Sequence, residues 1–463
     1  MKNALKKTFR NKSVTVMGLG TFGGGIGAAK FAAENGANVT VTDLKNENEL
    51  SESVSMLEGL GITFVLGRHE ISDFDGADIV IVSPAVPKES KYLTAAAESG
   101  AVLTTEIGLF IKFCPSLICG ITGSNGKTTT VSMIRSILER SGRNFRIGGN
   151  IGGSLLPELS EITPGDIVVL ELSSFQLEWL DEMKWSPYIA AVLNLTPNHL
   201  DRHGTFEKYS DAKSIILKYQ KSTDTAVLVK DDHGSKSFGE KVRGNCVWVG
   251  TDLDSDGISL ENEWILGRSG MSVDRVFKTK NLLIPGQHNI LNAMTAAACA
   301  KVMGIDNSII SQGLGAFKGI PHRLEFIGGY DGVKFYNDSK ATTPESAAAA
   351  VKAFGSNVIP ILGGYDKGVE FDAMAAEIAD NIQWAAIIGA TAEKISGALK
   401  REGVKCSVFG SLEEALEGCI ARAYKGDIIL LSPGCASYDM FSDYENRGEI
   451  FKSLVFKYIE NPK

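Results

Sequence analysis

A glycine-rich loop between an apolar run and a helix-like segment constrains the fold of this chain more than any other feature. The stretch GITGSNGKTTT covers residues 120–130, after SLIC and before VSMIRSILERS. Gly123 and Gly126 permit backbone conformations that aim several N–H groups at one phosphate. A helix that starts at the end of the loop adds the positive end of its dipole. The sequence therefore predicts a strand–loop–helix unit that binds the phosphates of ATP.

Two side chains of this loop have distinct expected roles. Lys127 supplies a point charge to the β- and γ-phosphates, and Thr128 offers a hydroxyl to Mg²⁺. The pattern G-x-x-x-x-G-K-[ST] would place a glycine at Ile121, so the loop alone leaves open whether the nucleotide phosphorylates, moves or activates a second molecule. The expected ATP contacts of the loop are Gly123, Ser124, Asn125, Gly126, Lys127, Thr128 and Thr129.

Short apolar β-branched runs alternate with helix-like segments along the whole chain. Residues 13–43 read as strand, glycine-rich turn, helix and strand, and similar alternations start near residues 117 and 318. This order is typical of parallel sheets covered by helices, which bind ligands at the carboxyl ends of their strands. At roughly 150 residues per domain, the sequence predicts an α/β protein of three domains, at 1–108, 109–318 and 319–463.

Composition narrows the class of protein. The net charge is −8, from 55 acidic and 47 basic side chains, which argues against nucleic acid as a partner. Seven scattered cysteines favour a reducing cytosol over a disulfide framework. No apolar run approaches the roughly 20 residues of a membrane-spanning helix. We expect a soluble, cytoplasmic protein without membrane insertion.

A second glycine motif follows the first apolar run. GLGTFG, with glycines at 18, 20 and 23, matches G-x-G-x-x-G, and Asp43 ends the next strand. The match fits NAD, another phosphate-bearing or uridine ligand, or a purely structural turn.

Three further side chains near the phosphate loop could serve chemistry. Glu171 ends the strand VVLE and could complete a Mg²⁺ shell or cap the next helix. His199 and His203 are four residues apart, which suits zinc on one helix face, but a phosphate-bound metal at His199 is the favoured interpretation. Lys213 lies in a helical segment, where composition alone predicts an exposed lysine.

The last third of the chain repeats the layout of a strand followed by a polar turn. Asn289 and Asn292 could cap a helix or read a base edge. Arg323 and Asp338 suit contacts with phosphate or ribose, and Lys340 could neutralise a transferred phosphoryl group. Lys367 in LGGYDKG and Ser437 in SPGCASYD could bind a small acidic substrate.

In their order, these motifs resemble those of the Mur ligases. GSNGKTTT, ELSSFQLE, NLTPNHLDRHG, GIPHRLE, NDSKAT and SPGCASYD span essentially the whole chain. Several also occur in folylpolyglutamate synthase, whereas ELSSFQLE and SPGCASYD resemble most closely the Mur ligases that add D-glutamate. The resemblance implies a Rossmann-like N-terminal domain that binds UDP, a central P-loop-type ATPase domain and a C-terminal Rossmann-like α/β domain that binds the amino acid.

The family also implies a role for individual residues. Lys213 would be carbamylated by CO₂ and would hold the second of two Mg²⁺ ions, and His199 would contact both metal and UDP substrate. The implied metal ligands are Thr128, Glu171, His199 and Lys213, and the implied catalytic residues are Lys127, Glu171, His199, Lys213 and Lys340. The implied UDP-substrate contacts are Gly18, Leu19, Gly20, Thr21, Asp43, Ser83, Asn150 and His199. Further ATP contacts are Asn289, Asn292, Arg323 and Asp338, and the amino-acid contacts are Lys340, Thr342, Lys367, Ser437, Tyr438 and Tyr444.

The expected reaction is the ATP-dependent addition of D-glutamate to UDP-N-acetylmuramoyl-L-alanine through an acyl phosphate, a step in peptidoglycan precursor synthesis. We expect a monomer whose C-terminal domain closes during the cycle. The alternatives are a sister ligase that adds L-alanine or a diamino acid, folylpolyglutamate synthase, a regulatory or transport ATPase, and an NAD-dependent dehydrogenase. Asn198, Tyr444 and Phe22 in the first glycine loop depart from the family pattern.

Overall fold

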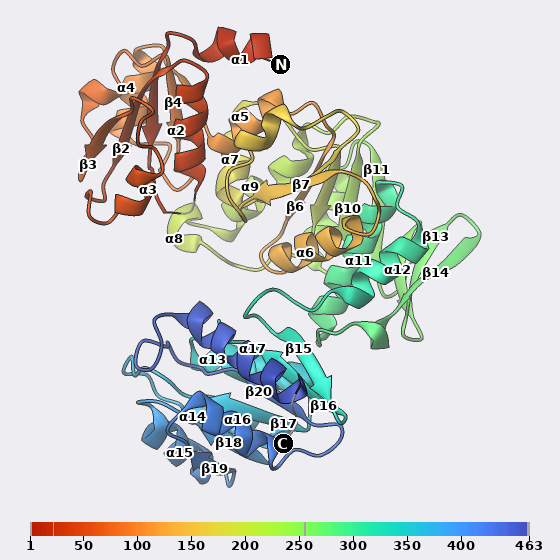
Figure 1. The fold of residues 1–463 in the computed structure, drawn as a ribbon. Helices are drawn as coiled ribbons and strands as arrows, with labels where there is room; N and C mark the ends of the chain where they lie inside the picture. Colours follow the sequence, from red (N-terminus) through yellow and green to blue (C-terminus); the bar gives the residue numbers. More distant parts are fainter. Residues whose placement is uncertain (1, 22, 254–255, 461–463) are drawn as a thin grey trace. The chain divides into compact units, whose positions relative to one another are not determined.

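The computed structural model describes residues 2–21, 23–253 and 256–460. It divides into two compact units. The first contains residues 1–278 and 291–313, and the second contains residues 279–290 and 314–463. The first unit holds two β-sheets and the second holds one (Figure 1).

The N-terminal sheet is parallel throughout, with strand order β3-β2-β1-β4-β5. The order reverses at β1, so the loops after β1 and β4 flank the point where such sheets bind ligands. Its strands are β1 (Ser13–Met17), β2 (Asn38–Asp43), β3 (Thr63–Leu66), β4 (Ile79–Val82) and β5 (Val102–Thr104). The helices of this region are α1 (Lys2–Phe9), α2 (Gly24–Glu34), α3 (Ser51–Ser55) and α4 (Lys91–Glu98).

The central sheet has the order β14-β13-β12-β11-β10-β9-β6-β8-β7. It is parallel from β7 to β12 and ends in two antiparallel pairs, β12–β13 and β13–β14. Its strands are β6 (Ile118–Thr122), β7 (Phe145–Gly149), β8 (Ile167–Glu171), β9 (Ile189–Val192), β10 (Thr225–Val229), β11 (Asn245–Gly250), β12 (Gly257–Glu261), β13 (Trp264–Ser269) and β14 (Ser272–Lys278). The accompanying helices are α5 (Glu106–Phe113), α6 (Lys127–Leu138), α7 (Ser174–Glu182), α8 (Leu200–His203), α9 (Phe206–Lys218), α10 (His233–Ser237), α11 (Gln287–Val302) and α12 (Asn307–Ala316).

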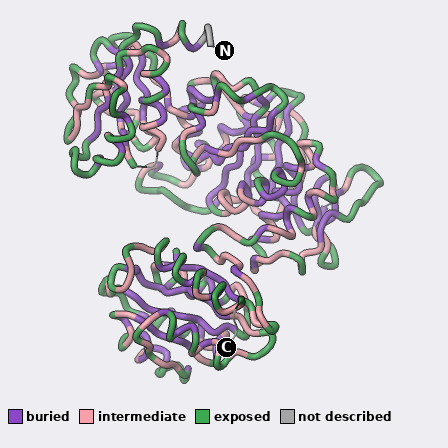
Figure 2. Tube along the Cα trace, viewed as in Figure 1, coloured by how far each residue is buried: buried purple, intermediate pink, exposed green. Residues whose placement is uncertain are grey.

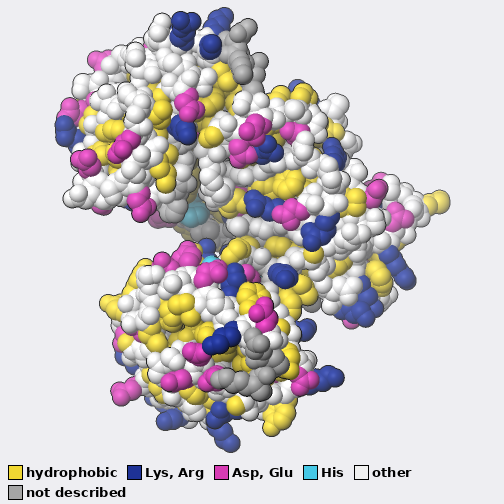
Figure 3. All heavy atoms as spheres, viewed as in Figure 1, with side chains coloured by type: hydrophobic (Ala, Val, Ile, Leu, Met, Phe, Trp, Pro, Cys, Tyr) yellow, Lys and Arg dark blue, Asp and Glu magenta, His cyan; other side chains and the backbone are white. Residues whose placement is uncertain are grey.

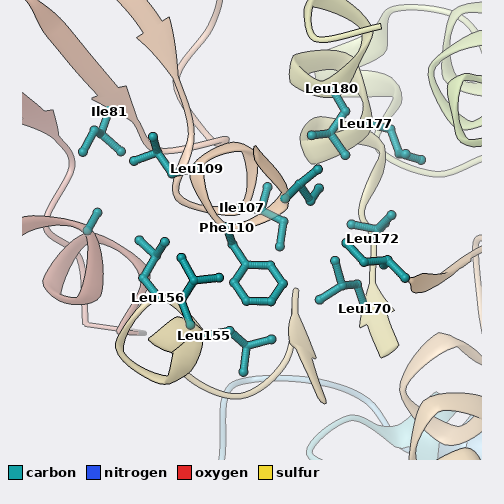
Figure 4. Packing of buried hydrophobic residues seen from close by; sticks show 14 of the residues in the cluster. Ile81, Ile107, Leu109, Phe110, Leu155, Leu156, Leu170, Leu172, Leu177 and Leu180 are labelled. Carbon is teal, nitrogen blue, oxygen red and sulfur yellow. The ribbon is translucent and has the colours of Figure 1, made fainter. Parts of the chain in front are cut away.

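Helix α5 joins the two sheets of the first unit into one core. Ile107 and Phe110 are almost fully buried, in one cluster with Ile81 of β4 and Leu170 of β8. Figure 4 shows Phe110 between side chains of the two sheets, with Leu155 and other leucines around it. Because burial of apolar area stabilises by roughly 25 cal/mol per Å², this shared cluster holds the two sheets together.

The second unit contains one six-stranded sheet with the order β15-β16-β20-β17-β18-β19. Only the β15–β16 pair is antiparallel. Its strands are β15 (Glu325–Tyr330), β16 (Val333–Asn337), β17 (Val358–Leu362), β18 (Trp384–Ile387), β19 (Lys405–Val408) and β20 (Ile428–Leu431). Its helices are α13 (Pro344–Phe354), α14 (Asp372–Ile378), α15 (Ala392–Arg401), α16 (Leu412–Ile420) and α17 (Tyr444–Glu460).

Burial follows the sequence pattern. Every residue of β6, β8, β9 and β17 is buried, as expected for parallel strands covered on both faces, and Figure 2 shows the buried strands inside exposed connections. Acidic and basic side chains are interspersed on the face shown in Figure 3. The predicted α/β class with Rossmann-like parallel sheets is confirmed; the boundaries at 108 and 318 stay predictions. Among the described residues, no helix is long and apolar enough to cross a membrane.

Candidate active site

The phosphate loop follows β6, which pairs with β8 on one side and β9 on the other. Gly126 has φ +84°, and a Cβ there would lie 2.4 Å from Asn292 Oδ1. Gly123 has φ +151°, and a Cβ there would lie 2.9 Å from the Cβ of Leu193. Both positions therefore require glycine, for conformation and for space. Helix α6 begins at Lys127 directly after the loop, as the sequence predicts.

Polar contacts fix the shape of the loop. Lys127 Nζ donates to the carbonyl oxygens of Gly123 (2.8 Å) and Ser124 (2.9 Å), so the ammonium group lies over the loop. The side chain of Asn194 accepts from Asn125 N at 2.8 Å and donates to Asn125 O at 3.0 Å. Sequence reasoning missed Asn194, although it lies two residues after the end of the buried strand β9. The loop is preorganised to receive an anion.

Glu171 is the candidate metal ligand in the sequence-based set that ends a strand. It ends β8 with 1 % of its surface exposed. One carboxylate oxygen accepts from Thr128 Oγ1 and the other from Asn150 Nδ2, each at 2.8 Å. A hydroxyl and a carboxylate beside a phosphate loop fit the oxygen ligands that Mg²⁺ prefers. Glu171 does not cap α7, because Ser173 is the N-cap of that helix.

Lys213 is buried, so the composition-based expectation of an exposed lysine is wrong. Its side chain comes from α9, with 2 % exposed, and its Nζ lies 3.3 Å from Thr122 Oγ1 at the end of β6. Burial, followed by the positive charge of Lys127, lowers the pKa of Lys213 to about 7, although Glu171 raises it. A substantial fraction is therefore a free amine near neutral pH, the form that reacts with CO₂.

The two histidines after β9 differ in environment. His199 is exposed with φ +52° at the start of the one-turn helix α8. His203 is buried; its Nε2 lies 3.0 Å from Ser174 Oγ and its Nδ1 lies 3.4 Å from a carboxylate oxygen of Glu178. Burial lowers the pKa of His203. His203 therefore anchors α8 to α7, and His199 is the histidine that remains accessible.

A cavity of about 730 Å³ lies at the reversal point of the N-terminal sheet. Six of the eight expected UDP contacts line it: Gly18, Leu19, Gly20, Asp43, Ser83 and Asn150. Thr21 and His199 are not among its lining residues, and Phe22 lies outside the described residues. Asp43 accepts from the backbone N–H of Gly20 (3.0 Å) and of Lys45 (2.9 Å), so it also shapes the glycine loop.

A carboxyl group that sequence reasoning missed also lines this cavity. Glu106 begins α5 and accepts from Ser154 Oγ at 2.5 Å. Burial raises the pKa of Glu106 to about 7, against the lowering effect of hydrogen bonds from Ser154 and the Leu155 backbone. Glu106 therefore links α5 to the loop after β7.

In the second unit, polar side chains follow β16, β17 and β20, which are neighbours in the sheet. Asp338 is buried, and its two oxygens accept from Leu324 N (3.1 Å) and Ser432 Oγ (2.8 Å). Burial raises its pKa to about 7, while these bonds and the charge of Arg323 lower it. Arg323 itself is exposed.

The two asparagines of α11 have different partners. Asn289 Nδ2 donates to Pro285 O at 2.6 Å in the second unit. Asn292 belongs to the first unit, where its Oδ1 lies 3.4 Å from Thr130 Oγ1. Asn292 is thus beside the phosphate loop, and Asn289 stabilises the turn before its helix.

The expected amino-acid contacts differ widely in exposure. Ser437 is buried and Thr342 is half-buried, whereas the side chains of Lys340, Lys367 and Tyr438 are exposed. Lys340 Nζ lies 5.7 Å from the ring centre of Tyr444. The exposed Tyr365, absent from the sequence-based set, packs edge-on against Tyr438 with ring centres 6.3 Å apart. These side chains present lysine, hydroxyl and aromatic groups on adjacent loops.

A fully buried arginine holds these loops in place. Arg447 of α17 donates to Ser339 Oγ (2.9 Å) and Ser339 O (2.8 Å) after β16. It also donates to Cys435 O (3.1 Å) and Ala436 O (3.3 Å) after β20. Burial lowers its pKa to about 10, so it stays charged at neutral pH. The sequence around Arg447 does not predict this role, because nothing local marks which loops the side chain contacts.

Family models match three consecutive parts of the chain. Residues 12–105 match the Mur ligase MurD-like N-terminal domain, 121–300 the Mur ligase middle domain, and 322–435 the Mur ligase glutamate ligase domain. These ranges correspond in order to the three sheets described above.

Known proteins are similar in sequence to this chain over nearly its full length. The chain is 37 % identical to the UDP-N-acetylmuramoylalanine–D-glutamate ligase of Koribacter versatilis (strain Ellin345), covering 98 % of this chain and 99 % of that protein. It is 39 % identical to the protein of the same name from Roseiflexus sp. (strain RS-1), covering 96 % and 98 %. The crystal structure of UDP-N-acetylmuramate-alanine ligase MurC from Thermotoga maritima has the same fold, with a TM-score of 0.56 and 19 % identity over 97 % of this chain and 99 % of that one. The chain therefore belongs to the Mur ligase family.

Proposed function

We propose that this protein is a cytoplasmic, monomeric ligase that uses ATP to join D-glutamate to UDP-N-acetylmuramoyl-L-alanine in peptidoglycan precursor synthesis. The observation that carries the proposal is the position of Asn150. Asn150 lines the 730 Å³ cavity, and its side chain donates to Glu171 beside the phosphate loop. A substrate whose nucleotide occupies the cavity can therefore extend its carboxylate toward a γ-phosphate at that loop. The names of the full-length relatives support the same substrates.

The phosphate loop would hold ATP for attack by that carboxylate. A carboxylate oxygen of the L-alanine residue forms a bond to the γ-phosphorus, and the bond from phosphorus to the β,γ-bridging oxygen breaks, releasing ADP. Lys127 would neutralise charge on the β- and γ-phosphate oxygens during this step, because its ammonium group already lies over the loop. Asn292 and the loop amides would orient the phosphates.

The amine of D-glutamate then attacks the carbonyl carbon of the acyl phosphate. The C–O bond to phosphate breaks, the nitrogen loses a proton, and the amide forms. Lys340 would stabilise charge on the departing phosphate, and Lys367, Thr342, Ser437, Tyr438 and Tyr444 would bind the amino acid. Arg323, Asp338 and Asn289 would be further ATP contacts. His199, as an exposed imidazole, is suited to contact either metal or UDP substrate.

The residues present fit two Mg²⁺ ions. Thr128 and Glu171 would hold one, and His199 with a carbamate on Lys213 would hold the other, since a carbamate gives Lys213 an anionic oxygen in place of its ammonium group. When bound, the ions would withdraw negative charge from the phosphates and the substrate carboxylate. The buried position of Lys213 and its pKa of about 7 support carbamylation.

Phosphate release with defined substrates tests this function. We expect release only when ATP, UDP-N-acetylmuramoyl-L-alanine and D-glutamate are all present, with L-glutamate, L-alanine and diamino acids inactive. Rapid ATP hydrolysis by the protein alone would indicate an ATPase, and a preference for another amino acid would indicate a sister ligase.

A further inference from the structure

The turn that lines one side of the substrate cavity is fastened to the segment that carries His199. Residues 83–86 follow β4, and Ser83, Ala85 and Val86 line the cavity. Gly18 permits the turn to approach closely, because a Cβ at this position would lie 2.9 Å from the Cβ of Ser83. The turn is therefore in direct reach of whatever fills the cavity.

Arg202 makes the connection. From helix α8 its guanidinium donates to Ala85 O at 2.7 Å and to Val86 O at 3.1 Å. It also lies 5.2 Å from the centre of the Phe175 ring, a favourable position for a cation over an aromatic face. A planar guanidinium can span two carbonyl groups in a way that an ammonium group cannot.

Phe175 extends the same cluster. Phe175 lines the cavity. The centre of its ring lies 5.1 Å from the His199 ring centre, and the ring stacks on His203 at 5.3 Å with the planes 11° apart. Arg202 therefore contacts two parts of the cavity wall, the turn at 83–86 and Phe175. A ligand that shifts either of them would also shift Arg202.

Helix α8 needs such anchors. It has four residues, from Leu200 to His203, which is too short to be stable alone. His199 before it has a left-handed backbone conformation that is unfavourable for a non-glycine residue. His203 fixes one end of the segment to α7, and Arg202 fixes it to the cavity turn.

We propose that Arg202 is a positioning residue that couples occupation of the UDP-substrate cavity to the placement of His199, and thereby to nucleotide binding. The inference rests on the proposed function for the identity of the cavity ligand and for the role of His199 at a nucleotide-bound Mg²⁺ ion. A filled cavity orders the turn and Phe175, which orders α8 through Arg202, so that nucleotide binds to an already ordered segment. By linkage the two ligands must then strengthen each other's binding equally.

Calorimetric titration with Mg²⁺ and the non-hydrolysable analogue AMPPNP tests the coupling, without and with saturating UDP-N-acetylmuramoyl-L-alanine. In the wild type we expect the second ligand to tighten AMPPNP binding by about 5-fold or more. In Arg202→Met we expect AMPPNP alone to bind nearly unchanged and the coupling to fall to about 2-fold or less. Arg202→Lys retains the charge without the two-carbonyl geometry, and we expect intermediate coupling. If the methionine variant fails to fold, the lysine variant tests the coupling in its place.

Lys88→Met is the matched control. Lys88 also fastens the segment after β4, but to α7, through Glu178 O at 3.0 Å and the Trp179 ring at 4.9 Å. We expect this variant to keep the wild-type coupling. Unchanged coupling in both Arg202 variants, equal loss in Lys88→Met, or no coupling in the wild type would overturn the inference. Failure of the wild type to bind UDP-N-acetylmuramoyl-L-alanine at all would overturn the proposed function, and the inference with it.

Discussion

The phosphate-loop region of the first unit and the candidate amino-acid loops of the second unit are built in opposite ways. Around the phosphate loop, Glu171 and Lys213 are almost completely buried. In the second unit, Lys340, Lys367 and Tyr438 are exposed, and they lie on loops supported from inside by the buried Arg447.

We expect the two regions to serve different steps of the reaction. Glu171 and a carbamate on Lys213 are anionic, so we expect them to act on the phosphate through the Mg²⁺ ions that they would hold. Because they are buried in fixed geometry, they would need no reorganisation during the reaction. Exposed lysines on supported loops can take up a small acidic molecule from water and release it again. Substitutions in the first region should therefore act on the chemical step, and substitutions of the exposed second-unit lysines should act on amino-acid binding.

The largest effect is expected for Lys213→Ala. Loss of the buried amine removes the proposed carbamate, and ligase activity should fall by about 10³-fold or more. Short-chain carboxylic acids such as formate or acetate should partly restore the rate, because they can supply the missing anionic oxygen. The measurement is phosphate release at saturating substrates.

Lys208→Ala is the control for Lys213, since Lys208 is on the same helix but exposed. It should retain nearly full activity. Full activity of Lys213→Ala in CO₂-free buffer, without added acid, would contradict the carbamate role.

Arg447→Met tests the support of the second-unit loops. The change removes the donor to the carbonyl groups of Ser339 and Cys435, while Ala436 O still accepts from Tyr365 N. It should lower the free energy of unfolding by about 3 kcal/mol. Urea denaturation measures this, with Arg401→Met as the control. Arg401 is in an exposed ion pair with Asp372, so its loss should change stability by less than about 1 kcal/mol. Equal effects of the two changes would show that Arg447 is not the support.

Lys367→Ala should affect binding without affecting the fold. Because its side chain is exposed, stability should change by no more than about 0.5 kcal/mol, while the KM for D-glutamate should rise by about 10- to 100-fold. Lys394→Ala is a matched control, since Lys394 pairs with the neighbouring Asp366 at 2.8 Å. A similar KM in both variants would remove Lys367 from the amino-acid site.

Glu106→Gln should give the smallest effect, and it should depend on pH. Burial raises the pKa of Glu106 from 4.5 to about 7, so between these values the folded state binds more protons than the unfolded state. Wild-type stability therefore falls as pH rises through this window. The glutamine variant lacks this loss and should be more stable than the wild type at pH 8, by about 1 kcal/mol.

This advantage should shrink as pH falls from 7 toward 4.5. Denaturation at a series of pH values measures it, with the exposed Glu98→Gln as the control. A stability difference that does not vary with pH would show that the Glu106 carboxyl does not titrate as the structure indicates.

The features predicted from the sequence are those that depend on residues close together in the chain. The loop at 123–129 needs only glycines, a lysine and flanking apolar runs, and the structure has the expected strand, loop and helix. The alternation of strands and helices likewise predicted the parallel sheets. The burial of Lys213 could have been predicted from helical spacing. Lys213 is four residues after Tyr209 and three before Ile216, so all three lie on the buried face of α9.

Other features depend on contacts between distant segments. Arg202 reaches a turn more than a hundred positions away, and Arg447 holds loops after two different strands. Their partners are mostly backbone carbonyl groups, which every residue carries, so no residue type at the other end reveals the pairing. The ligand-binding roles of the site residues remain predictions.

Oxygen transfer tests most directly the central claim that the nucleotide activates a carboxylate. UDP-N-acetylmuramoyl-L-alanine labelled with ¹⁸O in its carboxylate is converted with ATP and D-glutamate, and the released phosphate is analysed by mass spectrometry. The acyl-phosphate mechanism predicts one ¹⁸O atom in each phosphate, because the carboxylate oxygen that attacks phosphorus leaves with it. Unlabelled phosphate would contradict the acyl-phosphate mechanism and the carboxylate-activating role of the loop.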